Sequence, residues 1–299
     1  FFLPAFLLLV FGTVPAFAGP TQAELQQKVE DAREGAGLVA LGAVVANADG
    51  EILGLAVAGE RRKGSGDAVQ PDDAWHLGSN TKMLTALLYG RLVEQGAAKW
   101  GATLPELFPD LANLMDPAWQ DVTIEHLLSH RSGLVANPGP LWFLTARGKK
   151  ADMKTQRTRL AEGYLSEPPG GTTGEYVYSN LGYIIAGAAL DRIAAGLGEE
   201  DYEALLLSQL VPEGEGWGFG PPPEGIEGHA NGFFGLKARG KGLEADNPPA
   251  LAPAGTLHAP LEAHARFLSS FLSPDSTQAK LLTPYPDETA DYALGWSPL

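Results

Sequence analysis

Ser79 and Lys82 stand three residues apart in the stretch HLGSNTKMLTALLYGRLVEQG, residues 76–96, and this pair of residue types is suited to nucleophilic catalysis. A serine hydroxyl is a weak nucleophile until a neighbouring base takes its proton. A half-buried lysine has a lowered pKa and can act as that base. The pair therefore indicates acyl transfer, in which the serine oxygen attacks the carbonyl carbon of an ester or an amide.

Apolar residues at helical spacing place this pair at the start of a buried helix. They are Met83, Leu84, Leu87, Leu88 and Leu92. Ser79 is predicted to be the N-cap, with Lys82 one turn along on the same face, and the backbone N–H groups of the helix N-terminus would face the charge that develops on a bound carbonyl oxygen. The alternative is an ordinary capping serine and a solvated lysine, because Ser-x-x-Lys occurs by chance about once in a chain of this size.

Tyr178 and Asn180 form a second group of reactive side chains in PPGGTTGEYVYSNLGYIIAGAAL, residues 168–190. They lie in a predicted loop that leads into a buried helix over residues 181–193. A phenol can pass a proton, and an amide can bind a substrate carbonyl. The alternative is a packing aromatic residue followed by an asparagine that caps the helix.

The composition restricts the classes of function open to this chain. Its 299 residues, 44% of them hydrophobic and 19% charged, are sufficient for a large core. The formal net charge of −15 argues against nucleic acid or an anionic membrane as a partner, since both require clustered Lys and Arg. The absence of cysteine excludes a disulfide, a thiolate nucleophile and a thiolate metal site. Small molecules or peptides are the expected partners.

Residues 1–18 have the pattern of a secretory signal peptide. The segment is apolar and ends in Ala16-Phe17-Ala18, which predicts cleavage after Ala18 and a secreted or periplasmic protein. A retained membrane anchor is the alternative, although the segment is shorter than the roughly 20 apolar residues that span a bilayer. The chain starts with Phe1 and has no basic n-region, so we expect its beginning to be missing.

The remaining patterns predict a sheet region interrupted by a helical block. Thr21 and Glu24 are placed as a capping box, and residues 47–50 are a turn signal between two apolar runs. The predicted order is a helix over residues 21–35, a β-hairpin over 37–60, mostly helices over 80–210, irregular loops over 211–255, a helix over 260–272 and a strand over 291–299.

Together with TIEHLLSHRSGL, residues 123–134, these segments resemble the serine β-lactamase-related family, which includes class C β-lactamases, penicillin-binding-protein-like D-peptidases and family VIII esterases. The resemblance continues through PAGTLHAPLEAHARF at residues 253–267 and YALGW at 292–296. It implies a mixed α/β fold over residues 19–299, with an antiparallel sheet flanked by helices, a helical domain and the active site between them.

The resemblance also implies a role for each reactive side chain. Ser79 would be the acylated nucleophile, Lys82 its proton partner and Tyr178 a general base, with Asn180 contacting the substrate. The substrate would be an ester, a β-lactam or a D-amino-acid peptide, and no metal or organic cofactor is implied. A non-catalytic relative that binds peptidoglycan or another ligand in the same cleft is the alternative.

The family's third element is a strand with Lys or His, one residue and Gly, which should follow the YALGW segment. It is expected beyond Leu299, so the C-terminal strands are interpreted as truncated and this part of the chain as inactive without them. Residues 255–258 include a histidine, but they are predicted to precede a helix rather than to form a strand. His258 is therefore left outside the site.

Other reactive or aromatic residues have weaker claims to function. His126 and His130 are spaced like a zinc-binding pair, but the intervening glutamate of a metalloprotease is absent, so both are interpreted as packing or capping groups. The chain contains no Gly-x-Ser-x-Gly elbow, which argues against an α/β-hydrolase. Trp142, Phe143 and Trp217 fall in predicted loops and could line a substrate pocket or cover the core.

Overall fold

The computed structural model describes residues 20–146, 152–223, 225–232, 235–240 and 245–297. The predicted signal peptide, residues 1–18, lies outside the described residues. Within the structure the chain divides into two units. The first, the sheet unit, comprises residues 1–77, 213–246 and 257–275, and the second, the helical unit, comprises residues 78–212, 247–256 and 276–299. The sequence segments of the two units alternate, so the chain enters each of them three times.

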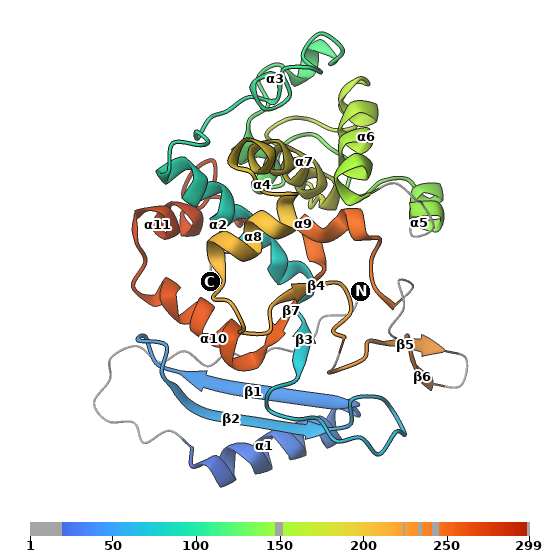
Figure 1. Cartoon of the computed structure of the whole chain (residues 1–299), viewed down its shortest axis with the longest axis vertical. Helices are drawn as coiled ribbons and strands as arrows, with labels where there is room; N and C mark the ends of the chain where they lie inside the picture. The colour runs from blue at the N-terminus through green and yellow to red at the C-terminus, as the bar shows by residue number, and fades with distance from the viewer. Residues whose placement is uncertain (1–19, 147–151, 224, 233–234, 241–244, 298–299) are drawn as a thin grey trace. The chain divides into compact units, whose positions relative to one another are not determined.

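The sheet unit contains the strands of the protein and the helices that cover them (Figure 1). Its elements are α1 (Gln22–Gly35), β1 (Ala40–Ala46), β2 (Ile52–Gly59), β3 (Ala74–His76), β4 (Gly218–Phe219), β5 (His229–Gly232), β6 (Gly235–Ala238), β7 (Leu257–Pro260), α10 (Leu261–Ser269) and η5 (Ser270–Leu272). The strands pair in three antiparallel sheets of order β1-β2, β3-β7-β4 and β5-β6.

The β1-β2 hairpin is covered on both faces, because side chains alternate between the two faces of a strand. On one face α1 packs Leu25 and Val29 against Ala56 and Ala58 of β2. On the other face α10 packs against Val44 and its neighbours. Figure 1 shows the hairpin as a layer between these two helices. The sequence predicted both the hairpin and the first helix correctly.

Local hydrogen bonds explain why these two predictions succeed. The Thr21 side chain accepts from the backbone N–H of Glu24, and the Glu24 carboxylate accepts from that of Thr21, which closes the predicted capping box. In the hairpin turn, Asn47 accepts from the backbone N–H of Gly50 through its carbonyl group, and Gly50 takes a positive φ of 78°. Each of these hydrogen bonds joins residues that are close in sequence. A short pattern of residue types can therefore predict it.

The three-stranded sheet contradicts the prediction for residues 211–258. β7 is its central strand, and His258 pairs with His76 of β3 and with Gly218 of β4. The prediction that residues 255–258 do not form a strand is therefore wrong, and so is the prediction that 211–255 is loop throughout, since β4, β5 and β6 lie there. Conversely, residues 291–297 form no strand. β4 and β7 depend on partners far away in sequence, which their own composition does not indicate, whereas β5 and β6 pair with each other.

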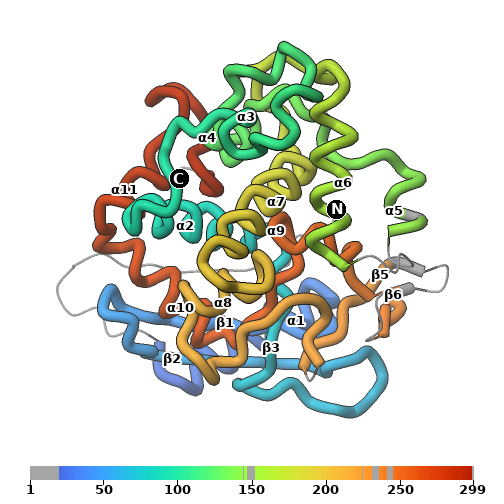
Figure 2. The backbone as a smooth tube through the Cα atoms, turned by 45° about the horizontal axis from the view of Figure 1, so that its top comes forward, coloured from blue at the N-terminus to red at the C-terminus, as the bar shows by residue number. Residues whose placement is uncertain are grey.

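The helical unit contains most of the helices. Its elements are η1 (Gly78–Asn80), α2 (Thr81–Glu94), α3 (Leu104–Leu107), η2 (Pro117–Trp119), α4 (Ile124–Leu128), α5 (Pro140–Ala146), α6 (Met153–Leu165), α7 (Asn180–Leu197), α8 (Tyr202–Leu210), η4 (Pro249–Leu251), α9 (Ala252–Gly255) and α11 (Ser276–Leu282). α7 packs against α2, α4, α6, α8 and α9, and several of these helices lie around it in Figure 2.

The sequence of α7 explains its central position. It is apolar on nearly all sides, so it is stable only where other helices surround it. Among the described residues no single helix has both the length and the apolar composition to cross a membrane, and only the bent pair of α7 and α8 meets both requirements jointly.

A buried arginine links three helices of this unit. Arg157 of α6 is fully buried and donates to both carboxylate oxygens of Asp191 in α7 and of Glu203 in α8, at 2.7–2.8 Å. A buried guanidinium is stable only when its donors are paired. The network therefore fixes α6, α7 and α8 relative to one another.

Candidate active site

Ser79 lies in the single turn of η1, directly before α2. The prediction that it caps the helix is wrong, because Asn80 takes the N-cap position and η1 inserts a 3₁₀ turn ahead of the α-helix. The Thr81 hydroxyl donates to the Gly78 carbonyl oxygen at 2.6 Å across this turn. Ser79 is exposed, and its hydroxyl contacts Lys82 and Tyr178 instead of the helix backbone. This position suits a nucleophile better than a structural cap.

Lys82 is buried within α2, with 1% of its surface exposed. Its Nζ donates to Asn180 Oδ1 at 2.8 Å and to the carbonyl oxygen of Ala254 at 2.6 Å, and it lies 3.3 Å from Ser79 Oγ. Burial disfavours the charged form and lowers the pKa of Lys82 to about 7. A substantial fraction of the side chain is therefore a neutral amine near neutral pH.

The hydrogen bonds around Nζ orient that neutral amine toward the Ser79 hydroxyl. A neutral amine has two N–H donors and one lone pair, whereas the ammonium has three donors. Asn180 and Ala254 present only acceptor oxygens, so they take the two donors. The lone pair is then left for the Ser79 hydroxyl, which can donate its proton to it.

Tyr178 contacts Ser79 from a loop before α7. Its hydroxyl donates to Ser79 Oγ at 2.9 Å, and Lys82 Nζ lies 4.8 Å from the centroid of its ring. Burial of the phenol raises the pKa of Tyr178 above its usual value. Tyr178 is therefore protonated near neutral pH, so of the two neighbours of Ser79 it is Lys82 that can accept a proton.

Asn180 is the first residue of α7, where the Ser179 side chain caps the helix by accepting from the N–H of Gly182. Its Oδ1 faces Lys82, and its Nδ2 donates to Oδ1 of Asn137 at 2.8 Å. Sequence reasoning placed Asn180 against the substrate, and the structure shows its amide bound to Lys82 and Asn137. Asn137, which was not predicted, therefore fixes the orientation of this amide.

The loop that carries Tyr178 is tied to residues 130–133. The N–H groups of Gly171, Gly174 and Val177 donate to carbonyl oxygens of that segment at 2.7–2.9 Å. Gly133 permits the close approach, because it has a φ of 82° and a Cβ there would lie 2.9 Å from the Gly171 carbonyl oxygen. The long approach to Tyr178 is thus held along its length by the segment HRSG.

The contact between Ala254 and Lys82 was also not predicted from the sequence. Ala254 belongs to α9, and its contribution is a backbone carbonyl, which any residue type could supply. The Thr85 hydroxyl donates to the adjacent Pro253 carbonyl oxygen at 2.8 Å and so ties α9 to α2. The segment PAG, residues 253–255, carries part of the family resemblance, but nothing in its composition indicates a contact with Lys82.

The two histidines of residues 123–134 lie in different environments. His126 Nδ1 accepts from the backbone N–H of Thr123 at 3.0 Å and completes the N-terminal capping box of α4, which agrees with a capping role. His130 is buried among aromatic rings beside Tyr178. Within the described ranges, no three carboxylate or histidine side chains are grouped to hold a metal ion.

The aromatic residues considered for a substrate pocket are placed as follows. Trp142 and Phe143 lie on α5 rather than in a loop, with their rings in edge contact at a centroid distance of 5.2 Å. Trp217 belongs to the sheet unit, where it contacts His264 and Phe267. His258 also lies there, and its Nδ1 is 2.9 Å from the Gly220 carbonyl oxygen.

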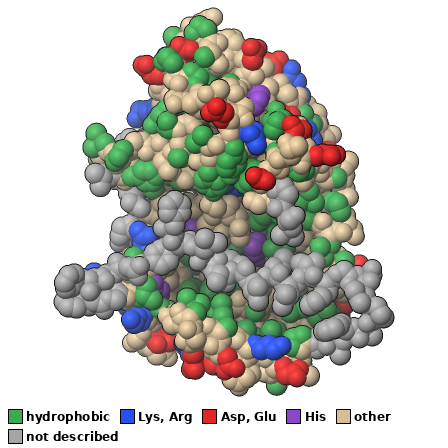
Figure 3. All heavy atoms as spheres, turned by 180° about the vertical axis from the view of Figure 1, so that it is seen from behind, with side chains coloured by type: hydrophobic (Ala, Val, Ile, Leu, Met, Phe, Trp, Pro, Cys, Tyr) green, Lys and Arg blue, Asp and Glu red, His purple; other side chains and the backbone are tan. Residues whose placement is uncertain are grey.

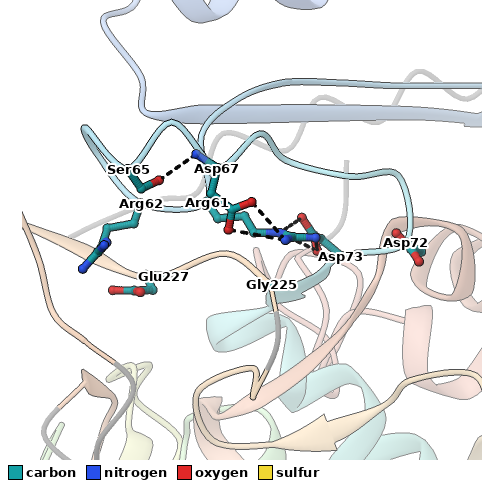
Figure 4. A pocket seen from close by; sticks show the side chains of 8 residues that line it. All are labelled: Arg61, Arg62, Ser65, Asp67, Asp72, Asp73, Gly225 and Glu227. Carbon is teal, nitrogen blue, oxygen red and sulfur yellow. Dashed lines mark hydrogen bonds and ion pairs between the residues drawn. The ribbon is translucent and has the colours of Figure 1, made fainter.

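A cavity of about 550 Å³ lies in the sheet unit. Figure 4 shows that the side chain of Arg61 forms ion pairs in its wall with Asp67 and Asp73, at 3.2 and 2.8 Å. Arg61 thus partly neutralises Asp67 and Asp73 in this wall. None of Ser79, Lys82, Tyr178 and Asn180 lines this cavity.

Comparison with known proteins identifies the family of the chain. A model of the beta-lactamase family matches residues 25–297. The chain belongs to the beta-lactamase family. The predicted recognition and the predicted mixed α/β fold are both confirmed, since the solved structures that resemble the chain have the β-lactamase and transpeptidase fold.

Two curated relatives illustrate the activities found among similar proteins of the beta-lactamase family. Esterase EstB of Burkholderia gladioli is 32% identical over 191 residues, covering 58% of this chain and 45% of the esterase. Penicillin-binding protein 4 of Amycolatopsis lactamdurans is 33% identical over 162 residues, covering 54% of this chain and 39% of that protein. The chain spans less than half the length of these two relatives.

Solved structures of the same fold are more distant in sequence. The D-amino acid amidase of Ochrobactrum anthropi SV3 matches with a TM-score of 0.68 at 19% identity, over 88% of this chain and 74% of the amidase. The octameric penicillin-binding protein homologue of Pyrococcus abyssi matches with a TM-score of 0.68 at 19% identity, over 92% of this chain and 64% of that one. At this identity the likeness establishes the fold.

Proposed function

We propose that this protein is a serine hydrolase that forms an acyl-enzyme on Ser79 and cleaves an ester or an amide. The observation that carries the proposal is the placement of Ser79 Oγ between two proton-transfer groups, 2.9 Å from the Tyr178 hydroxyl and 3.3 Å from Lys82 Nζ. Membership of a hydrolase family supports it. An ordinary capping serine would have no reason to be exposed beside a buried lysine and a phenol.

The proposed reaction begins when neutral Lys82 takes the proton of the Ser79 hydroxyl as Oγ attacks the substrate carbonyl carbon. Collapse of the tetrahedral intermediate breaks the bond to the leaving oxygen or nitrogen, which takes a proton from the Tyr178 hydroxyl. The Lys82 ammonium restores that proton to the phenolate. Water then attacks the acyl-enzyme, its proton passes to the same groups, and Ser79 is released with its hydroxyl restored.

The substrate class follows from the relatives. Their names describe an esterase, a penicillin-binding protein and a D-amino acid amidase, so an ester, a β-lactam or a D-amino-acid amide is proposed here. The three classes share an electrophilic carbonyl, and the residues around Ser79 act on that carbonyl rather than on the groups that distinguish the classes.

A panel of three substrates tests the proposal on the full-length protein. A nitrophenyl ester, a D-Ala-D-Ala peptide and a cephalosporin would be assayed with the wild type and with Ser79→Ala. Turnover of at least one substrate, lost in Ser79→Ala at unchanged thermal stability, is the expected result. Binding of a substrate without turnover in the wild type would instead favour a non-catalytic ligand-binding relative.

A further inference from the structure

His130 contacts the segment that carries Tyr178 on both sides of the tyrosine. Its carbonyl oxygen accepts from the backbone N–H of Val177 at 2.8 Å, and its ring Nδ1 accepts from the backbone N–H of Ser179 at 3.0 Å. These two N–H groups belong to the residues directly before and after Tyr178. One residue therefore fixes the backbone on either side of the phenol.

The ring of His130 also touches the phenol itself. The centroids of the His130 and Tyr178 rings lie 4.3 Å apart, with a tilt of 39° between their planes. The ring of Tyr183 lies at 5.2 Å and that of Tyr292 at 4.8 Å, so the imidazole is enclosed. The enclosed imidazole has little freedom to rotate. The Tyr178 phenol packs against this ring, so its own position is restricted as well.

The backbone of His130 is in an uncommon conformation. Its φ is 63°, and among the described residues it is the one non-glycine residue with a positive φ. Non-glycine residues in this region are strained and are enriched at functional sites, where the surrounding structure enforces them. Here that conformation accompanies a bend that brings both the carbonyl oxygen and Nδ1 of His130 to the tyrosine segment.

The hydrogen bond to Ser179 requires an unprotonated Nδ1. Burial, together with the positive charge of Lys82, lowers the pKa of His130 to about 3. The imidazole is then neutral at all pH values where the protein would work, with its proton on Nε2. His130 is thus available as a hydrogen-bond acceptor and does not compete with Lys82 for the proton of Ser79.

We propose that His130 is a positioning residue that holds the Tyr178 hydroxyl against Ser79, through its two backbone-directed hydrogen bonds and its ring contact. The kinetic part of this proposal rests on the proposed hydrolase function. The structural part, that His130 fixes residues 177–179, stands independently of any activity.

Three substitutions separate the contributions of His130. His130→Asn keeps an acceptor at the place of Nδ1 and tolerates the left-handed conformation. His130→Gly tolerates that conformation but has no acceptor, and His130→Leu keeps an apolar side chain without an acceptor. We expect kcat to fall on the order of 10²-fold in the Leu and Gly variants with little change in KM, because the phenol is misplaced. We expect His130→Asn to recover most of the loss.

Amide hydrogen exchange gives a readout that needs no turnover. The amide of Ser179 should exchange about tenfold faster or more in His130→Leu than in the wild type and in His130→Asn, because it donates to the imidazole, whereas the amide of Val177 donates to the backbone carbonyl oxygen of residue 130, which every variant keeps. The amide of Asn180, which donates to Ala136, serves as the internal control. Unchanged exchange at Ser179 in His130→Leu would overturn the proposal, even if the protein proved not to be a hydrolase.

A double-mutant cycle with Tyr178→Phe distinguishes positioning from general support of the fold. The Phe variant keeps the ring against His130 but lacks the hydroxyl. If His130 acts through that hydroxyl, His130→Leu should cost nothing further in kcat in the Tyr178→Phe background. An equal loss in both backgrounds would show that His130 acts on the site in another way, and would overturn the proposal while leaving Ser79 as the nucleophile.

Discussion

In the proposed mechanism, proton transfer at Ser79 depends on the different surroundings of its two neighbours, Lys82 and Tyr178. Burial lowers the pKa of Lys82 to about 7, whereas burial of the Tyr178 phenol raises the pKa of that group. Near neutral pH a substantial fraction of Lys82 is therefore a neutral amine that can accept a proton, whereas Tyr178 keeps its proton and can donate it. The family resemblance alone had assigned the role of general base to Tyr178, and the environments favour Lys82 for the first proton transfer.

The pH dependence of the reaction should follow Lys82. Because the neutral amine is the reactive form, kcat/KM should fall about tenfold per pH unit below about pH 7 and should level off above it. Ester hydrolysis by the full-length protein would be measured from about pH 5 to about pH 9. Lys82→Ala should lose roughly 10²–10⁴-fold in rate. Lys99→Ala, a control at an exposed lysine, should leave the profile unchanged.

Persistence of the same acid limb in the residual activity of Lys82→Ala would contradict this assignment. It would mean that another group near Ser79 takes the proton.

At the scale of elements, the site depends on the contact between α7 and α9. Gly187 of α7 faces Pro253 of α9 so closely that a Cβ at position 187 would lie 2.1 Å from the proline ring. This approach lets the next residue, Ala254, present its carbonyl oxygen to Lys82. The packing of two helices thus determines one of the two acceptors that orient the base.

Two glycines of the same helix provide a matched test of this contact. Gly187→Ala should destabilise the protein by about 1–3 kcal/mol through overpacking, and it should lower the rate by moving the Ala254 carbonyl. Gly196→Ala has open space around the new methyl group and should stabilise the protein by roughly 0.5–1 kcal/mol with unchanged activity. Denaturant unfolding and ester hydrolysis would be measured for both. If Gly187→Ala hydrolysed the ester at the wild-type rate, the position of α9 would not affect the function of Lys82.

The elements also show what the sequence could predict. The first helix and the hairpin were predicted because their capping box and turn are formed by residues three or four apart. Ser79, Lys82, Tyr178 and Asn180 were predicted as site residues from side-chain types at fixed spacing and from the family resemblance, and the structure brings all four together. The backbone carbonyl of Ala254 was not predicted, because every residue type has such a carbonyl. The pairing of β7 was not predicted, because pairing between strands distant in sequence leaves little local pattern.

At the scale of the whole molecule, the acidic charge limits the choice of partners. The formal net charge is −15, and on the face shown in Figure 3 Asp and Glu side chains are scattered among basic and hydrophobic groups. Electrostatic attraction of a polyanion requires clustered positive charge. Neutral or cationic substrates would approach this surface without the long-range repulsion that an anionic substrate meets, an effect that salt reduces.

Export of the protein is the prediction that concerns the chain as a whole. If residues 1–18 are a signal peptide, the mature protein recovered from the medium or the periplasm should begin at Gly19. Intact-mass measurement of the exported protein would show this. Recovery in the membrane fraction with residues 1–18 still attached would instead identify the segment as an anchor.

Covalent labelling of Ser79 tests the central claim most directly. The full-length protein would be treated with a fluorophosphonate, which reacts with activated serine hydroxyls, and the modified peptide would be identified by mass spectrometry. The account predicts one labelled residue, Ser79, and no labelling in Ser79→Ala at unchanged thermal stability. Labelling that persists in Ser79→Ala, or that maps to another serine of the wild type, would place the nucleophile elsewhere and contradict the account.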